Sequence, residues 1–296
     1  MTNSITTRIM PEGYLQSVPR PSKKELEDFY TNLYYEEGVT DTYQATYTDE
    51  EIIQKKLRAD CTVELLAQNV KVDADNIKSL EVGCGEGFVI QSCVARGWNA
   101  IGVDYRAAPV QKMNKGVIEN FVEADPIQFL TKANADDEKF DVIILQNVLE
   151  HVLDPKEIME LLLRLASDKG CILVQVPNDF SDIQKLAKEQ NRIDNDYPLC
   201  HPQHLNYFND QNLGDFISSV GGHIVDGITD FPIEMYLWGN ESNYVLDKSL
   251  GKFAHSARVN LDIFLSRKGI QKYLDFYRSC YNLSLGRNLS VVIRRS

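Results

Sequence analysis

Residues 77–88, IKSLEVGCGEGF, say more about the fold than any other part of this chain. The stretch begins as a strand candidate over 77–83 and ends in glycine at alternate positions, Gly83, Gly85 and Gly87. Glycine permits a tight turn and lets the backbone pass close to a ligand, and the helix expected to follow would present its first N–H groups there. The stretch therefore predicts a strand, a turn and a helix with a binding site at the turn.

Strand candidates recur along the rest of the chain and alternate with helical stretches. The runs at 140–146 and 170–177 are continuously apolar, as expected for strands buried on both faces of a parallel sheet. The other candidates are 99–105, 120–125, 223–231 and 288–295. This alternation predicts an α/β fold: a doubly wound, Rossmann-like, seven-stranded sheet that is mostly parallel with an antiparallel last strand.

The order of elements divides the chain into four parts. Capping boxes at Ser22 and Thr48 predict helices in the tyrosine-rich start, which we interpret as a helical N-terminal lid region. A second helical stretch interrupts the final pair of strands as an insertion. The four parts are the lid region 1–75, the Rossmann-like core 76–231, the helical insertion 232–285 and the last strand 286–296.

Composition argues against several classes of protein. The 296 residues include 43 acids and 31 bases, a net charge of -12 that disfavours nucleic-acid binding. The chain contains no apolar stretch long enough to span a membrane, and its start lacks the features of a secretory signal. Its six cysteines form no CxxC pair, which is typical of reduced thiols, so we expect a cytoplasmic location.

Asp104 is the second signal for a nucleotide-like ligand. It closes the predicted second strand, where doubly wound folds place an acid that binds ribose hydroxyls. A dinucleotide fingerprint needs G-x-G-x-x-G, but Phe88 stands where the third glycine belongs. This argues against an NAD(P)-dependent Rossmann oxidoreductase, which remains the alternative enzyme class.

Taken in order, these motifs resemble the class I S-adenosylmethionine-dependent methyltransferases. LEVGCGEGF (80–88) resembles the family's first motif, Asp104 in GVDY its second, and Asp125 in EADP its third. FDVIILQNVLEHVLDP (140–155) is similar to the strand-four motif of the branch that includes the ubiquinone-biosynthesis O-methyltransferases. GCILVQVPND (170–179) resembles the fifth-strand motif. The resemblance covers the core and the last strand.

The resemblance implies S-adenosyl-L-methionine as the cofactor, with S-adenosyl-L-homocysteine as the product. Asp104 would accept hydrogen bonds from the ribose hydroxyls, Asp125 would bind the adenine amino group, and Tyr105 would cover the adenine edge. The other cofactor-binding candidates lie at the ends of the first and fourth strands, where the methionine part would sit: Glu81, Gly83, Cys84, Gly85, Gly87, Phe88, Gln146 and Asn147.

Methyl transfer to a hydroxyl also needs a group that takes up the proton. The candidate bases are His204 and His201, in the loop after the fifth strand, and His151, which follows the fourth strand. The spacing of His201 and His204 would suit a metal, but no third ligand is apparent in the sequence, so we expect no metal.

We expect a small-molecule acceptor. The segment HPQHLNYF (201–208) and the helical insertion look like those of methyltransferases from bacterial glycan and secondary-metabolite pathways. This likeness suggests a nucleotide- or lipid-linked sugar, or a secondary metabolite, as the acceptor of O-methylation. The insertion would cap the acceptor site, where Tyr236, Trp238 and Tyr244 could stack on a sugar or an aromatic ring. These aromatic residues would suit the core of the insertion or a homodimer contact at least as well. A noncatalytic binding protein that keeps the fold is a third alternative.

Overall fold

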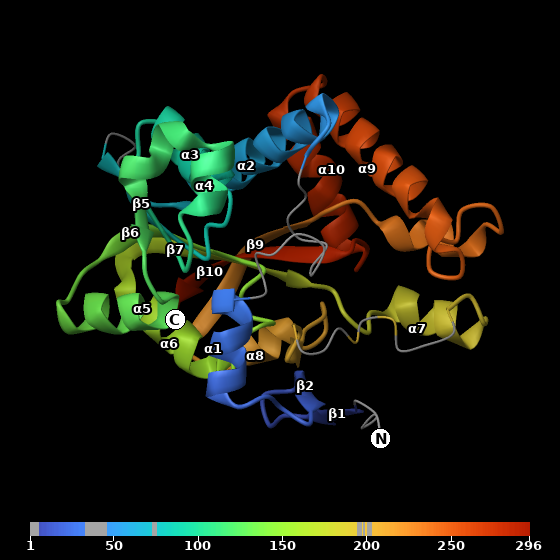
Figure 1. The fold of residues 1–296 in the computed structure, drawn as a ribbon, viewed down its shortest axis with the longest axis horizontal. Helices are drawn as coiled ribbons and strands as arrows, with labels where there is room; N and C mark the ends of the chain where they lie inside the picture. The colour runs from blue at the N-terminus through green and yellow to red at the C-terminus, as the bar shows by residue number, and fades with distance from the viewer. Residues whose placement is uncertain (1–5, 33–45, 73–75, 194–196, 198, 200–202) are drawn as a thin grey trace.

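The computed structural model describes residues 6–32, 46–72, 76–193, 197, 199 and 203–296. Its centre is a seven-stranded sheet with helices on both faces (Figure 1). In the order of the sheet, the strands are β5 (Phe121–Glu123), β4 (Asn99–Asp104), β3 (Lys78–Val82), β6 (Phe140–Gln146), β7 (Ala166–Pro177), β10 (Asn288–Arg295) and β9 (Gly222–Thr229). Neighbouring strands are parallel except where β10 pairs antiparallel with β7 and with β9. The predicted sheet is confirmed.

The strand order places a binding crevice at β3 and β6. The chain winds outward from β3 through β4 to β5, and then returns to the other side of β3 with β6 and β7. Ligands of such sheets bind at the carboxyl ends of the strands where the order reverses. The glycine turn after β3 and Asp104 at the end of β4 both lie at this edge.

Helices cover the two faces of the sheet in separate layers (Figure 1). One layer contains α2 (Asp49–Asn69), α3 (Phe88–Ala95) and α10 (Ile270–Asn282), and the other contains α5 (Pro126–Ala135), α6 (Pro155–Leu165) and α8 (Leu213–Ser219). The other helices are α1 (Lys23–Asn32), α4 (Ala108–Met113), η2 (Lys115–Asn120), α7 (Asp182–Glu189), η3 (Ile233–Trp238), η4 (Lys248–Leu250) and α9 (Gly251–Ser266). The doubly wound arrangement is therefore the one predicted.

Helices α1 and α2 begin directly after the capping residues predicted from the sequence. Glu25 and Ser22 exchange side-chain and backbone hydrogen bonds at the start of α1, and Thr48 and Glu51 do the same at the start of α2. Asp154 accepts from two backbone N–H groups at the start of α6. Each cap satisfies backbone donors that the first helical turn leaves unpaired.

Part of the region that we expected to be helical contains strands. β1 (Thr6–Ile9) and β2 (Leu15–Val18) form a hairpin, and β2 pairs with β8 (Asn206–Tyr207) to complete a small antiparallel sheet. The expectation is corrected for these residues because β2 is stabilised by a partner strand far along the chain. Arg20 fixes the hairpin to the core by donating to the carbonyl groups of Val152 and Leu153.

The helical insertion completes one face of the sheet. α10 packs against β9, and α9 packs against α2 and α10. The insertion is therefore part of the helical layer that contains α2. Within the described part of the chain, no helix combines the length and the apolar composition that crossing a membrane requires.

Candidate active site

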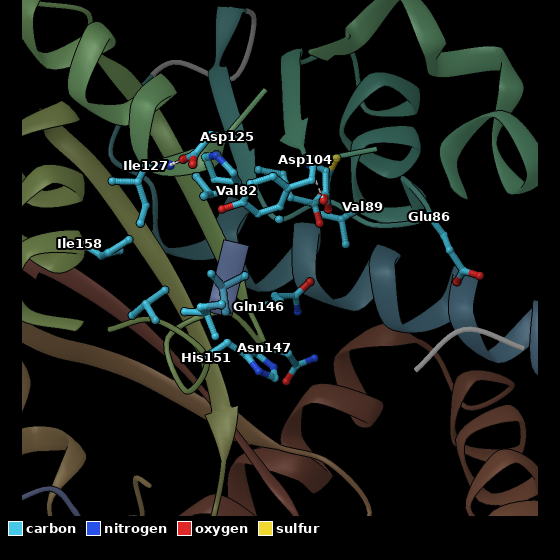
Figure 2. A pocket seen from close by; sticks show the side chains of 18 of the residues that line it. Val82, Glu86, Val89, Asp104, Asp125, Ile127, Gln146, Asn147, His151 and Ile158 are labelled. Atoms are coloured by element: carbon cyan, nitrogen blue, oxygen red, sulfur yellow. Dashed lines mark hydrogen bonds between the residues drawn. The ribbon is translucent and has the colours of Figure 1, made fainter. Parts of the chain in front are cut away.

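A cavity of about 500 Å³ opens at the carboxyl ends of β3, β4 and β6 (Figure 2). Lys23 and Leu26 of α1 form part of its wall. The predicted site residues that line it are Glu81, Gly83, Cys84, Gly87, Phe88, Asp104, Tyr105, Asp125, Gln146, Asn147 and His151. The fold thus brings together side chains and backbone from four separate motifs. His204 does not line this cavity, and His201 lies outside the described residues.

The glycine turn depends on glycine at each of its three positions. The backbone angle φ is 74° at Gly83, 51° at Gly85 and 76° at Gly87, in the left-handed region that other residues rarely adopt. At Gly83 a Cβ atom would also lie 2.5 Å from Cγ2 of Val148. The turn can therefore present its backbone to the cavity only while these positions carry no side chain.

Asp104 joins the end of β4 to the glycine turn. Its Oδ2 accepts a 2.7 Å hydrogen bond from the backbone N–H of Gly85, and its Oδ1 accepts one of 2.7 Å from Tyr105. A carboxylate offers roughly four lone-pair positions and accepts hydrogen bonds only, which is the chemistry that ligand hydroxyls need. The buried side chain is thereby held in one orientation at the cavity wall.

Glu81 is a buried carboxyl group with an unusual environment. Burial first, and the nearby Asp104 second, hold its pKa well above the ordinary value, against a hydrogen bond from the backbone of Ile90. Its Oε2 has no hydrogen-bond partner among the described residues. A cation that enters the cavity would stabilise the ionised form of such an acid. The methionine part of S-adenosylmethionine carries an ammonium group and a cationic sulfur, so this environment fits that cofactor.

Asp125 has a structural task as well as a place in the cavity wall. Its Oδ1 accepts from the backbone N–H groups of Ile127 at 2.8 Å and Gln128 at 3.1 Å, and so caps α5. Figure 2 shows Asp125 and Ile127 together at one end of the cavity. Because Oδ1 is the capping atom, Oδ2 is the atom suited to accept from an adenine amino group.

Two amide side chains at the end of β6 are fixed by a third amide on β7. Gln146 Nε2 donates to Gln175 Oε1 at 3.2 Å, and Gln175 Nε2 donates to Asn147 Oδ1 at 3.1 Å. Asn147 has a φ of 53°, which few residues other than glycine adopt. Strained backbone of this kind is frequent at ligand sites. Gln146 and Asn147 therefore face the cavity in defined orientations.

Glu86 ties the glycine turn to the N-terminal region, a link that the sequence motifs did not reveal. Its carboxylate accepts a 2.8 Å hydrogen bond from the Tyr47 hydroxyl and pairs with the Lys55 ammonium group at 2.8 Å. The Lys55 nitrogen also lies 4.4 Å from the centre of the Tyr47 ring. Residues before and within α2 thus hold the turn from outside.

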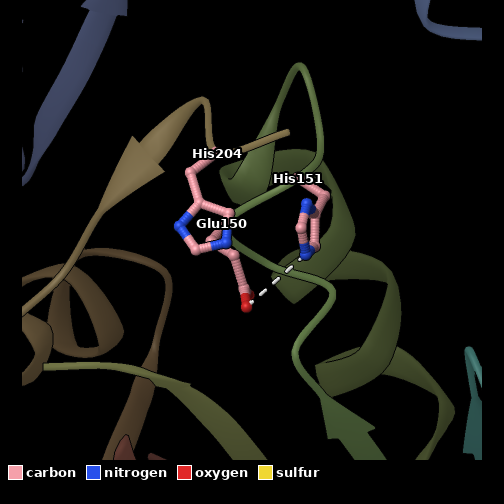
Figure 3. A group of neighbouring side chains, drawn as sticks. All are labelled: Glu150, His151 and His204. Atoms are coloured by element: carbon pink, nitrogen blue, oxygen red, sulfur yellow. Dashed lines mark ion pairs between the residues drawn. The ribbon is translucent and has the colours of Figure 1, made fainter. Parts of the chain in front are cut away.

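Glu150, His151 and His204 form a cluster beside the cavity (Figure 3). His151 Nε2 lies 3.7 Å from Glu150 Oε1, and the two imidazole rings are 5.0 Å apart. One ligand atom from each of the three side chains lies within 4.8 Å of the others, a spacing that would suit a metal ion. For the pair His201 and His204 the sequence showed no third ligand; the structure instead brings Glu150 and His151 beside His204, while His201 lies outside the described residues.

The protonation of this cluster follows from its burial. Burial lowers the pKa of His151 to about 3 and that of His204 to about 4, and raises the pKa of Glu150 to about 8. His151 Nδ1 lies 2.7 Å from the carbonyl oxygen of Gln203, so Nδ1 carries the proton and Nε2 the lone pair. At neutral pH these three side chains are therefore mainly uncharged.

Comparison with known proteins identifies the family. The family described as "Methyltransferase domain" matches residues 51–222, which include the glycine turn, Asp104 and the end of β6. The chain belongs to the S-adenosylmethionine-dependent methyltransferases. This membership removes the support for the oxidoreductase alternative.

Curated relatives of this methyltransferase match part of it. A ubiquinone biosynthesis O-methyltransferase of Pectobacterium atrosepticum is 32% identical over 38% of this chain and 44% of its own length. One from Pasteurella multocida is 35% identical over 38% of this chain and 48% of its own length. The chain thus spans less than half the length of these relatives.

Among solved structures, a SAM-dependent methyltransferase from Archaeoglobus fulgidus shares 18% identity and covers 84% of this chain and 100% of its own, with a TM-score of 0.49. Our assignment of this methyltransferase's fold rests on its sheet order.

Trp238 and Tyr244 of the insertion do not line the 500 Å³ cavity of this methyltransferase. Trp238 Nε1 donates to Gln190 Oε1 at 2.7 Å, and the Tyr244 hydroxyl lies 3.2 Å from that of Tyr197. Both side chains belong to a small apolar cluster beside α7. Their contacts indicate packing between the insertion and the loop after β7.

Proposed function

We propose that this chain transfers the methyl group of S-adenosyl-L-methionine to a hydroxyl group of a small molecule. The observation that carries the proposal is the 500 Å³ cavity, in which a hydrogen bond joins Asp104 to the glycine turn. Beside them lies Oε2 of Glu81, for which the described part of the chain provides no hydrogen-bond partner. The curated relatives are named O-methyltransferases, which favours oxygen as the acceptor atom.

The cofactor's three parts match three regions of the cavity in this proposal. The adenine would lie between Tyr105 and the Asp125 end, the ribose at Asp104, and the methionine along the glycine turn with its ammonium group toward Glu81. The cofactor supplies a methyl group that is already activated by the positive charge of its sulfur. The protein's main task is then alignment of the acceptor, which contributes ~7–11 kcal/mol in well-oriented reactions.

The acceptor proton would pass to the histidine cluster. His151 lines the cavity, and its neutral ring carries a lone pair on Nε2. His204 lies beside it and 3.9 Å from Asp179, which accepts from Arg287 at 2.7 Å. In this proposal His151 accepts the proton, and the carboxyl group of Glu150, with Oε1 3.7 Å from His151 Nε2, is the acid placed to face the charge that results. The N-terminal region, which contributes Lys23 and Leu26 to the wall, would close over the bound cofactor.

A turnover assay tests the proposal. The chain would be incubated with methyl-deuterated S-adenosylmethionine and a panel of catechols, neutral sugars and nucleotide-linked sugars, each beside its amine analogue. We expect a labelled methyl ether from one hydroxyl acceptor and no product from its amine analogue, detected by mass spectrometry. Transfer to the amine alone would contradict O-methylation. Binding of the cofactor without transfer to any acceptor would support a noncatalytic protein instead.

A further inference from the structure

A second cavity, of about 240 Å³, adjoins the first between α2 and the sheet. The two cavities share Lys55, Phe88, Val89, Gln146 and Asn147 in their walls. The second cavity extends away from the cofactor cavity toward β7, β10 and β9. A molecule bound there would meet the first cavity at the amide pair that closes β6.

A row of polar side chains crosses the sheet beneath this cavity. Gln146 pairs with Gln175 in the register of β6 and β7, and Gln175 pairs with Ser290 in that of β7 and β10. Gln175 Oε1 accepts hydrogen bonds from Gln146 at 3.2 Å and from Ser290 at 2.9 Å. Thr62 of α2 accepts from Gln146 at 3.5 Å on the opposite wall.

The row interrupts an apolar core. On each of these three strands, the residue two positions further from the cavity faces the same side of the sheet. These residues are Ile144, Leu173 and Val292, and all three are buried and apolar. Polar groups cost free energy when they are buried, even if hydrogen bonds offset part of that cost. A polar row that replaces core residues only where the cavity lies is therefore built for an occupant.

The charges around the cavity are paired. Arg58 lies 3.3 Å from Asp230, and Asp230 also accepts from the side chain of Asn288 at 2.6 Å. Lys55 is paired with Glu86. An anionic occupant would have to compete with these carboxylates, whereas amides and hydroxyls can both donate to and accept from the hydroxyl groups of a neutral molecule.

We propose that this second cavity is the acceptor subsite and that it binds a neutral, polyhydroxylated ring such as a sugar. Its volume is below the ~300–1,000 Å³ of pockets that enclose drug-sized ligands, and so suits a single ring. The Phe88 ring in the wall offers an apolar surface for one face of that ring. The inference rests on the proposed function, because it places the acceptor beside the cofactor cavity.

Saturation-transfer NMR in the presence of S-adenosylhomocysteine tests the inference. The probes are galactose, rhamnose and myo-inositol, with galactose 1-phosphate and glucuronate as anionic counterparts. The variants are Ser290→Ala and Thr62→Val, which each remove one hydroxyl from the wall. Ser79→Ala is the matched control, since Ser79 is a buried serine of the same sheet that lines neither cavity. Thermal denaturation of every variant checks that it folds.

We expect at least one neutral ring to bind and its affinity to fall about tenfold in each wall variant, as for the loss of one hydrogen bond. Ser79→Ala should bind it as the unaltered chain does. The inference is overturned if only anionic probes bind, if no neutral probe binds, or if the wall variants weaken S-adenosylhomocysteine binding by a similar factor. That last result would assign the cavity to the cofactor, whereas a chain that binds no S-adenosylhomocysteine would contradict the proposed function itself.

Discussion

Oδ2 of Asp104 accepts a 2.7 Å hydrogen bond from the backbone N–H of Gly85, so one carboxylate links the end of β4 to the turn that ends β3. If the same carboxylate holds two ribose hydroxyls, Asp104→Ala removes two charge-assisted hydrogen bonds of ~1.5–3 kcal/mol each. We predict that S-adenosylhomocysteine binding weakens by at least about 100-fold, measured by calorimetry. The control is Asp168→Ala, which removes an exposed acid of β7. Equal affinity in the two variants would contradict the assignment of Asp104.

Cofactor binding should release a proton through Glu81. The raised pKa keeps this acid protonated in the free protein at pH values where an ordinary glutamate is ionised, and a bound cation favours the ionised form. Affinity should therefore rise with pH until the pKa of the free protein is passed. Calorimetric titration in two buffers of different ionisation enthalpy measures the release, which should disappear in Glu81→Gln. The same proton release in both proteins would exclude Glu81 as its source.

Two glycines should respond to alanine with opposite signs. Gly83→Ala places a Cβ atom 2.5 Å from Val148 at a left-handed position, so we expect a loss of stability of ~1–3 kcal/mol and loss of cofactor binding. Gly214 lies in α8 with nothing within 4 Å of an added Cβ, so Gly214→Ala should stabilise by ~0.5–1 kcal/mol. Urea denaturation measures both. A stable Gly83→Ala protein that still binds S-adenosylhomocysteine would contradict the geometry of the turn.

The stability of the protein should depend on pH through Glu150. Its pKa of about 8 in the folded state lies above that of an unfolded glutamate, so the folded state keeps a proton that the unfolded state loses. This contribution is fully present below the unfolded value and is lost as pH rises toward 8. His151 and His204 have lowered pKa values. Above pH ~6.5 both are neutral in the folded and the unfolded chain, so they no longer change the stability with pH.

Between pH ~6.5 and ~8 the change of stability with pH therefore comes from the buried acids and not from these histidines. We predict that the melting temperature of the chain falls over this interval and falls less steeply in Glu150→Gln. Glu64→Gln serves as a control, because the pKa of Glu64 is lowered and its carboxyl group therefore stays ionised throughout this interval. If Glu150→Gln leaves the slope unchanged, the carboxyl group of Glu150 is ionised in the folded protein.

His151 should act in turnover and not in cofactor binding. Removal of a general base lowers the rate ~10²–10⁴-fold, so His151→Gln should lose turnover by this factor and retain its affinity for S-adenosylhomocysteine. Because the pKa of His151 is about 3, the pH profile of kcat should show no inflection from this histidine between pH 5 and 8. Full activity in the variant would show that His151 is not the general base, which would then be His204 or a group outside the cluster.

The main sheet was predictable because strand candidates alternate with helical stretches along the chain, and because Phe140–Gln146 and Ala166–Pro177 appear as apolar runs typical of strands buried on both faces. Lys78–Val82 and Phe140–Gln146 match their predicted ranges to within a few residues. β1 and β2 were not predictable in this way. β2 is four residues long, and Gln16 on it contacts Asn206 across a separation of 190 residues. Local sequence patterns carry no record of such a partner.

The cofactor cavity was predictable for a similar reason, since each motif closes a strand and the strands end at one edge. Groups that depend on long-range packing were not. Glu150 is buried by the loop whose Leu205 N–H donates to its carbonyl oxygen, and Arg58 meets Asp230 across 172 residues. The polar row of the second cavity likewise depends on the register of three strands.

Titration calorimetry of the unaltered chain with S-adenosylhomocysteine and, in parallel, with NAD tests the cofactor assignment on which the other predictions depend. We predict micromolar binding of S-adenosylhomocysteine and no measurable binding of NAD. The cavity holds the carboxyl groups of Asp104 and Glu81, which we propose bind the ribose and the methionine ammonium group, whereas the turn lacks the third glycine of a pyrophosphate site. Binding of NAD, or of neither ligand, would contradict the account.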